Sequence, residues 1–206
     1  RIKDGPLVSA TGESSLQNAL KGTEDGDQAT LYGGMLYQRV ERVLGRTGLK
    51  SEVTTFVPVN TDDQIELMKI RITNISDDPI TITATAATPI YGRSADNIRD
   101  HRNVTSMLNR IRTTRYGVIN DPTLTFDERG HRLNEMEYGF FAAEEEGTEP
   151  VGFCPLLEDF IGEGGSLDNP SFPVTGKPFY DRADRIDGFE AMGAAIFKER
   201  ILKPGQ

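Results

Sequence analysis

The chain has no tryptophan and a single cysteine, Cys154, among its 206 residues. One cysteine excludes an internal disulfide and is typical of a reducing compartment, so we expect a cytoplasmic protein. Cys154 follows Phe153 in an apolar run, which favours a buried, unreactive thiol over a nucleophile. Two histidines and one cysteine are also too few for a zinc site with three or four nitrogen and sulfur ligands. We therefore expect no metal and no bound cofactor.

Long apolar runs and a basic surface are missing as well. No stretch approaches the roughly 20 apolar residues that cross a bilayer, so we expect no membrane partner. The formal net charge is −9, which argues against nucleic acid because binding of phosphates requires a basic surface. The dense basic segment at 99–115 fits an amphipathic or ion-paired role better than RNA binding.

Sequence motifs of common enzymes are absent too. The chain contains no G-x-S-x-G elbow and no glycine-rich phosphate loop between a strand and a helix. The acidic run at 24–27 lacks the spacing of a calcium-binding EF-hand and fits a solvated turn. With 32 acidic residues, no pair of carboxylates can be singled out as catalytic. From the residues alone, no active site is visible.

What the sequence does contain is strand periodicity. Residues 50–59 and 65–75 alternate with a period of two and are rich in β-branched side chains. The S-D-D-P turn at 76–79 leads into a third alternating run at 79–90. These runs predict an antiparallel meander of consecutive strands.

The second half of the chain shows shorter strand signals between turns. We expect strands at 115–120, 123–126, 137–144 and 151–157, and a loop at 159–173. Residues 105–112 fit a helix or a strand, 14–21 a short helix, and 191–202 a helix by length, although the turn K-P-G-Q follows at once. Many short strands predict an all-β fold, an antiparallel β-sandwich with short helices and long loops.

The domain organisation expected from these patterns is simple. Loops, a helix and a first strand occupy 1–49, and the β-sandwich occupies 50–206; together they form one domain. The chain starts at Arg1 rather than at a methionine. We therefore expect a piece of a longer protein.

A cluster of charged residues lies between two apolar runs near the middle of the chain. Asp127, Glu128 and His131 stand together there, a combination that could serve acid–base catalysis. The flanking runs, 123–126 and 137–144, predict two strands, and Gly130 suits the turn between them. We interpret the charges as an exposed hairpin tip.

Several segments in the same order resemble the N-terminal β-sandwich of glycoside hydrolase family 94. They are HRNVTSMLNRIRTTRYGVINDPTLTFDERGHRLNEMEYGFFAAEE (101–145), EDFIGEGGSLDNP (158–170), EVTTFVPVNTDDQIELMKIRITNISDDPITI (52–82) and ILKPG (201–205). The resemblance covers about residues 50–205, and it rests on several co-linear segments.

The resemblance implies a galactose-mutarotase-like supersandwich and a glycoside phosphorylase. Family members cleave β-glucosides with inorganic phosphate as co-substrate and release glucose 1-phosphate. Their catalytic acid belongs to an (α/α)6 barrel that follows the sandwich, so this chain alone should be inactive. The resemblance also implies a homodimer and a glucan or oligosaccharide partner. The Y-G-R-S-A-D-N-I-R-D-H-R stretch at 91–102 is most similar to the β-1,2-oligoglucan branch.

One binding role follows from the resemblance. In cellobiose-phosphorylase-like members, an arginine in a loop after the central strands reaches the acceptor sugar, and the matching position here is Arg102. His101 and Arg99 lie beside it, and Arg93 is the next candidate. A guanidinium group suits neighbouring sugar hydroxyls because it donates two hydrogen bonds in a fixed geometry. Alternatively, Arg99 or Arg102 pairs with Asp96 or Asp100 in a structural role.

Two other function classes remain open. An autonomous carbohydrate-binding module would need a flat, exposed aromatic platform, whereas the 10 Phe and 6 Tyr residues mostly fall on strand positions that predict core. A mutarotase acting alone would need a histidine and a glutamate that converge in a cleft.

Overall fold

The computed structural model describes residues 1–11, 28–45, 47–92, 106–127, 130–180 and 185–206, and only the backbone at 125–127 and 131. Within these ranges nearly all regular structure is β-strand in antiparallel sheets, which confirms the predicted all-β fold. No helix in the described part of the chain is long and apolar enough to cross a membrane. The helix predicted at 14–21 lies outside the described residues.

The chain divides into two compact units, which we call unit 1 and unit 2. Unit 1 comprises Arg1 and residues 83–199, and unit 2 comprises residues 2–82 and 200–206. The expected division at 49/50 falls within unit 2, at the first residues of a strand, and that division stays a prediction.

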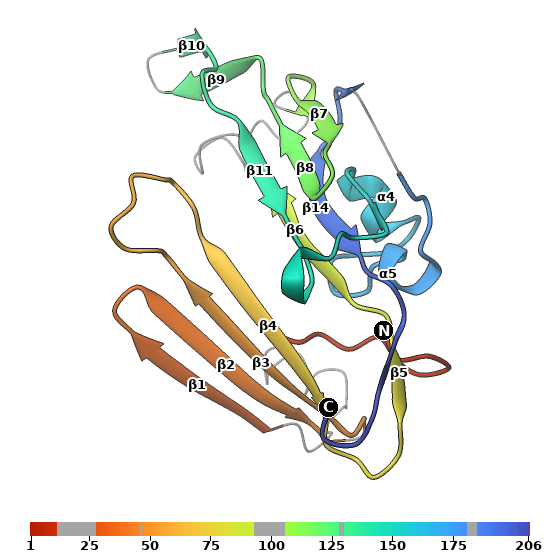
Figure 1. Cartoon of the computed structure of the whole chain (residues 1–206). Helices are drawn as coiled ribbons and strands as arrows, with labels where there is room; N and C mark the ends of the chain where they lie inside the picture. Colours follow the sequence, from red (N-terminus) through yellow and green to blue (C-terminus); the bar gives the residue numbers. More distant parts are fainter. Residues whose placement is uncertain (12–27, 46, 93–105, 128–129, 181–184) are drawn as a thin grey trace. The chain divides into compact units, whose positions relative to one another are not determined.

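Unit 2 is built on a four-stranded antiparallel sheet whose strands follow one another along the chain (Figure 1). Its strands are β1 (Gln28–Gly34), β2 (Tyr37–Leu44), β3 (Leu49–Phe56) and β4 (Leu67–Asn74). The register places Val53 between Val40 and Ile70, so the alternating apolar side chains of neighbouring strands share one face. This is the side that the period-two pattern of 65–75 predicts.

The N-terminal segment lies against this apolar face. Arg42 and Ser51 are buried there, and they donate hydrogen bonds to the carbonyl oxygens of Ser9 and Ala10. A buried guanidinium and a buried hydroxyl are tolerated because these carbonyl groups satisfy them. Leu44 and Leu49 continue the core at the adjoining end of the sheet.

The predicted meander is correct only as far as β4. The next strand, β5 (Ile80–Ile82), pairs with β15 (Arg200–Leu202) near the end of the chain, and β6 (Thr85–Ile90) pairs with another C-terminal strand. Alternation in a sequence shows which side chains share a face, but it does not identify the neighbouring strand. The meander prediction for 79–90 was therefore wrong in its pairing.

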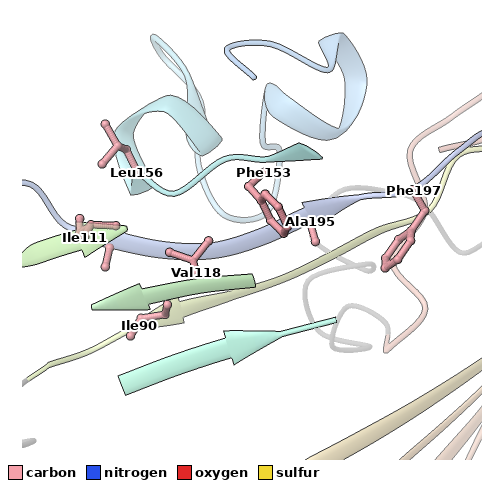
Figure 2. Packing of buried hydrophobic residues seen from close by; sticks show 8 residues of the cluster. Ile90, Ile111, Val118, Phe153, Leu156, Ala195 and Phe197 are labelled. Carbon is pink, nitrogen blue, oxygen red and sulfur yellow. The ribbon is translucent and has the colours of Figure 1, made fainter. Parts of the chain in front are cut away.

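Unit 1 contains two sheets that pack against each other through a shared core. One sheet has the order β11–β8–β7–β13 and the other the order β12–β14–β6. Figure 2 shows how Ile111 and Val118 from the first sheet meet Ile90 and Ala195 from the second. The remaining strands span Arg110–Thr113 (β7), Gly117–Asn120 (β8), Tyr138–Phe141 (β11), Gly152–Phe153 (β12), Ile186–Asp187 (β13) and Ala191–Ile196 (β14).

The C-terminal run 191–202 and the two helices that pack on it differ from the expected elements. Residues 191–202 form two strands, β14 and β15, instead of a helix, and all six residues of β14 are buried. Ala191 and Ala195 face the sheet core, whereas Met192 and Ala194 pack against the helices α4 (Leu157–Ile161) and α5 (Phe172–Thr175). A strand buried on both faces shows a continuous apolar run without alternation, which the sequence cannot distinguish from a buried helix. The two helices also lie where strand end and loop were expected.

The backbone at Asp127 and His131 belongs to the two strands of a hairpin, but its second strand differs from the expected one, and Glu128 lies outside the described residues. The strand β9 (Leu124–Asp127) pairs with β10 (Gly130–Leu133), and Gly130 has a positive φ of 115°. The apolar run at 137–144 instead supplies β11, which pairs with β8. Leu133 is 80% exposed, so the hairpin does not turn an apolar side chain into a core at this position. The ambiguous segment 105–112 provides the start of β7.

Candidate functional site

The four predicted substrate-binding residues, Arg93, Arg99, His101 and Arg102, lie outside the described residues. Whether these four side chains lie close together therefore stays a prediction. What it describes is the framework in unit 1 at the two ends of their segment, where the chain leaves β6 and where it returns before β7.

Just before this segment, the backbone at Gly92 lies against the buried side-chain amide of Asn120. Tyr91 and Gly92 follow the last residue of β6, and a Cβ atom on Gly92 would lie 2.7 Å from Nδ2 of Asn120 and 2.4 Å from Cγ of Pro122. Because both distances are too short for a side chain, a glycine is required at position 92. Asn120 is fully buried.

The returning end lies against the same amide. Ser106 and Asn109 are buried, and the backbone N–H of Asn109 donates to the carbonyl oxygen of Ser106 at 3.0 Å. The side-chain Nδ2 of Asn109 donates to the carbonyl oxygen of Phe189 at 2.8 Å, and Nδ2 of Asn120 donates to Oδ1 of Asn109 at 3.0 Å. The first bond fixes the orientation of the Asn109 amide, and the second then fixes that of Asn120.

One acceptor in this set of hydrogen-bonded amides has no donor among the described residues. Oδ1 of Asn120 is buried and has no hydrogen-bond partner within the described part of the structure. A small cavity lies nearby, lined by Ile90, Tyr91, Gly92, Asn109, Leu157, Glu190 and Ala191, with about 10 Å³ of space. Such a volume holds about one water molecule and not a sugar ring. The described residues around this cavity thus hold the chain at the two ends of the segment 93–105, and the cavity itself is not a sugar site.

The nucleophile candidate of unit 1 is inactive. Burial, with a smaller contribution from Asp159, raises the pKa of the Cys154 thiol to about 12, and the thiol is fully buried. This confirms the interpretation of Cys154 as a buried, unreactive residue. Burial also raises the pKa of Tyr180 to about 12, and its hydroxyl donates to Oδ2 of Asp159 at 2.8 Å. Both groups are protonated at neutral pH, so neither serves as a base or an activated nucleophile.

Unit 2 carries a second surface that the sequence interpretation missed. We call it the polar face: the side of the β1–β4 sheet opposite Val53. Tyr37 and Phe56 are direct cross-strand neighbours there, and the Tyr37 ring lies over Gly34, with ring atoms 2.0–2.7 Å from the position of a glycine Cβ. The ring therefore lies across the β1 backbone, and Tyr37 is 47% exposed.

Charged side chains share this face of the sheet with the rings. The guanidinium of Arg39 lies 4.3 Å from the ring centre of Tyr32, its cross-strand neighbour, and pairs with Glu41 at 3.0 Å. Lys50 pairs with Glu41 at 3.4 Å and with Glu52 at 3.6 Å. An exposed ring beside such donors and acceptors is the chemical pattern that stacks against a sugar and binds its hydroxyl groups.

The expectation that the aromatic residues form the core holds for only part of them. Phe153, Phe160, Phe172 and Phe197 are buried, but six other aromatic residues are not. Tyr32, Tyr37, Tyr91, Phe141, Phe179 and Phe189 are all exposed. The strand periodicity was real in the case of Tyr32 and Tyr37, but these residues alternate onto the polar face. Periodicity alone does not show which face is buried.

The chain matches a known protein family. A family model described as the supersandwich domain of glycosyl hydrolase 94 matches residues 34–188. This range covers more than half of the chain and includes strands of both units. No curated protein matches the chain.

Proposed function

Because the chain belongs to glycosyl hydrolase family 94, we propose that it is a non-catalytic supersandwich domain of an inverting glycoside phosphorylase. In the full-length protein, a β-glucan and phosphate would give glucose 1-phosphate and a shortened glucan. The family match over 34–188 carries this proposal.

In this proposal the segment 93–105 supplies the acceptor side of the cleft. Arg102 donates hydrogen bonds to the acceptor sugar, with His101, Arg99 and Arg93 as further contacts. The buried amides of Asn109 and Asn120 support it, because they fix the chain on both sides of the segment. The partners are then a glucan, the protein's own (α/α)6 barrel and a second copy of the protein, and no nucleic acid or membrane.

The proposed location is the cytoplasm. A single cysteine that is buried as a free thiol supports a reducing compartment.

The phosphorylase proposal is tested by comparing this chain with the longer reading frame that contains it. Both are incubated with β-glucan and phosphate, and glucose 1-phosphate is measured. Release by the longer protein alone is expected. Release by the 206-residue chain would overturn the non-catalytic role, and no release by either would overturn the phosphorylase.

The acceptor role is tested in the longer protein with Arg102→Ala. Loss of one or two charge-assisted hydrogen bonds should raise the KM for the acceptor sugar about tenfold to a hundredfold in the synthetic direction. Arg115→Ala is the control, because Arg115 is an exposed arginine paired with Glu149 at the surface of unit 1. An equal effect of both variants would show that Arg102 has no specific contact with the acceptor.

The polar face favours a second candidate function, a carbohydrate-binding module. Its support is the exposed ring of Tyr37 over Gly34 and, on the same face, the exposed ring of Tyr32 beside Arg39. Titration of the isolated chain with β-glucan oligosaccharides distinguishes the two functions, since a module should bind more tightly than millimolar. Tyr37→Ala should then abolish binding, whereas Phe141→Ala, which removes an exposed ring from unit 1, should not.

A further inference from the structure

The outermost strand of unit 2 has an unprotected edge. β1 is the terminal strand of its sheet, and among the described residues only β2 pairs with it. All seven of its residues are exposed, and its sequence, QATLYGG, contains neither a charged residue nor a proline. Proteins usually protect such edges with charges, prolines or bulges, because an open edge pairs with other strands.

The printed register identifies the backbone groups that are free to pair. Gly34 lies opposite Tyr37, and only Met35 and Leu36 lie between them. The residues that close such a two-residue hairpin exchange both backbone hydrogen bonds, so every second residue from Gly34 points its N–H and C=O towards β2. The intervening residues, Ala29, Leu31 and Gly33, therefore point theirs outwards.

We propose that the β1 edge pairs with β1 of a second copy of this chain, antiparallel, with Leu31 on the two-fold axis. The outward-pointing residues are symmetric about Leu31, so Ala29 of each copy lies opposite Gly33 of the other. Every outward N–H then meets an outward C=O, as an isologous interface requires. This proposal rests on the homodimer of the proposed function and identifies its contact surface.

The side chains also suit a self-pairing. Leu31, Val40, Val53 and Ile70 form one row across the apolar face of the sheet, and Leu31 is its most exposed member at 67%. With Leu31 opposite its own copy, the rows of the two sheets join into one apolar band. On the polar face Tyr32 lies opposite Thr30 of the other copy, a favourable pair on neighbouring strands.

The composition of β1 allows a second copy to pair with it without charge repulsion. Because β1 carries no charge, its self-pairing places no like charges opposite each other. Strand pairing alone buries less than the ~1,600 Å² of a typical stable interface. The dimer of the isolated chain is therefore expected to be weak and to depend on concentration.

Sedimentation of the 206-residue chain over a range of micromolar concentrations tests the interface without any enzyme assay. Wild type should form a dimer, and Leu31→Lys should weaken it at least tenfold, because two like charges then meet at the two-fold axis. Met35→Lys is the matched control, since Met35 is 91% exposed at the hairpin tip but lies off the edge. A monomer at all concentrations, or equal effects of both variants, would overturn the interface and leave the phosphorylase proposal standing.

Cross-linking tests the register. Cys154 is buried, so a cysteine introduced at Leu31→Cys is the reactive one in the folded chain. A short bis-maleimide should join two such chains, because paired residues on neighbouring strands lie ~5.5 Å apart. Met35→Cys should not cross-link, since the two positions would be about 26 Å apart at ~3.3 Å per residue. Cross-linking at position 35 alone would contradict the register. A monomer whose β1 amides resist hydrogen exchange would show that a strand of the same chain pairs with this edge instead.

Discussion

At the scale of single residues, burial controls the chemistry of this protein. Cys154 and Tyr180 keep their protons because the charged forms would lose solvation inside unit 1. The polar groups of Arg42, Ser51 and Asn109 are buried too, but each finds a carbonyl oxygen. Such pairing maintains the fold and does not by itself provide reactivity.

The Cys154 thiol should be unreactive in the folded chain. Its pKa rises from 9.0 to about 12, so at pH 8 the folded protein holds about a thousandfold less thiolate than the unfolded one. A maleimide should therefore label Cys154 slowly in buffer and rapidly in urea. Rapid labelling of the folded chain would contradict the buried position.

The same shift predicts a dependence of stability on pH. A pKa that is raised in the folded state stabilises the protein fully below the unfolded value, here 9.0, and this stabilisation is lost as the pH rises towards about 12. The free energy of unfolding should thus fall more steeply between pH 9 and 12 in wild type than in Cys154→Ala. Parallel curves for the two proteins would show that the thiol is not responsible.

Asn120 offers a test of the buried amide chain. Asn120→Asp places a carboxylate in a fully buried position, and the unfolding free energy should fall by about 3 kcal/mol or more at neutral pH. Because burial raises the pKa of such a carboxyl group, the loss should shrink as the pH falls and the group is protonated. Asn60→Asp is the control, since Asn60 is exposed and Asp tolerates its positive φ of 60°.

At the scale of the elements, β14 is the central strand of unit 1. Its residues alternate between the core of the two sheets and the surface that packs on α4 and α5. The side that faces the first sheet carries only small residues, Ala191, Gly193 and Ala195. Gly193 faces the first sheet, where a Cβ atom would lie 2.4 Å from both Cβ and Cγ of Phe140.

Gly193→Val should therefore destabilise unit 1. The clash involves the inner atoms of Phe140, which cannot move without its strand, so a loss of about 1–3 kcal/mol or more is expected in urea unfolding. Gly33→Val is the control, because nothing lies near a Cβ atom at Gly33 on β1. Equal destabilisation by both variants would show that strand propensity and not packing is responsible.

At the scale of the whole molecule, the C-terminal end of the chain returns to unit 2 and pairs with residues from its earlier half. The C-terminal strand β15 pairs with β5, and the buried Asn74 donates to the carbonyl oxygens of Asp78 and Leu202 at 2.7 and 2.9 Å. The backbone N–H of Asn74 donates to the carbonyl oxygen of Gln206 at 2.9 Å. Unit 2 is thus completed only after unit 1 has been synthesised.

Deletion of residues 200–206 should destabilise unit 2 selectively. The deletion removes the partner of β5. It also removes one acceptor of the Asn74 side-chain amide and the acceptor of its backbone N–H, so the amides of β4 and β5 should exchange hydrogen faster. The amides of β8 and β14 in unit 1 should be unaffected. Faster exchange in both units would show that the C-terminal segment stabilises more than its own unit.

In the alternating runs of the first half of the chain, the sequence alone determined which kind of element forms and which residues share a face. The alternation at 65–75 required a strand with Ile70 and Ile72 on one side, because side chains of a strand point to opposite faces in turn. The isolated cysteine in its apolar run required a buried thiol. The co-linear segments between 50 and 205 sufficed for the family, which the match over 34–188 confirms.

Only the tertiary structure decided which strands pair and which faces are covered. The pairing of β5 with β15 joins positions more than a hundred residues apart, and no local pattern encodes such a contact. The run at 191–196 is a strand because two layers cover it, whereas a helix would satisfy the same apolar residues. Tyr37 lies on the exposed polar face for the same reason: hydrophobicity shows that a side chain can be buried, but the neighbouring elements determine whether it is.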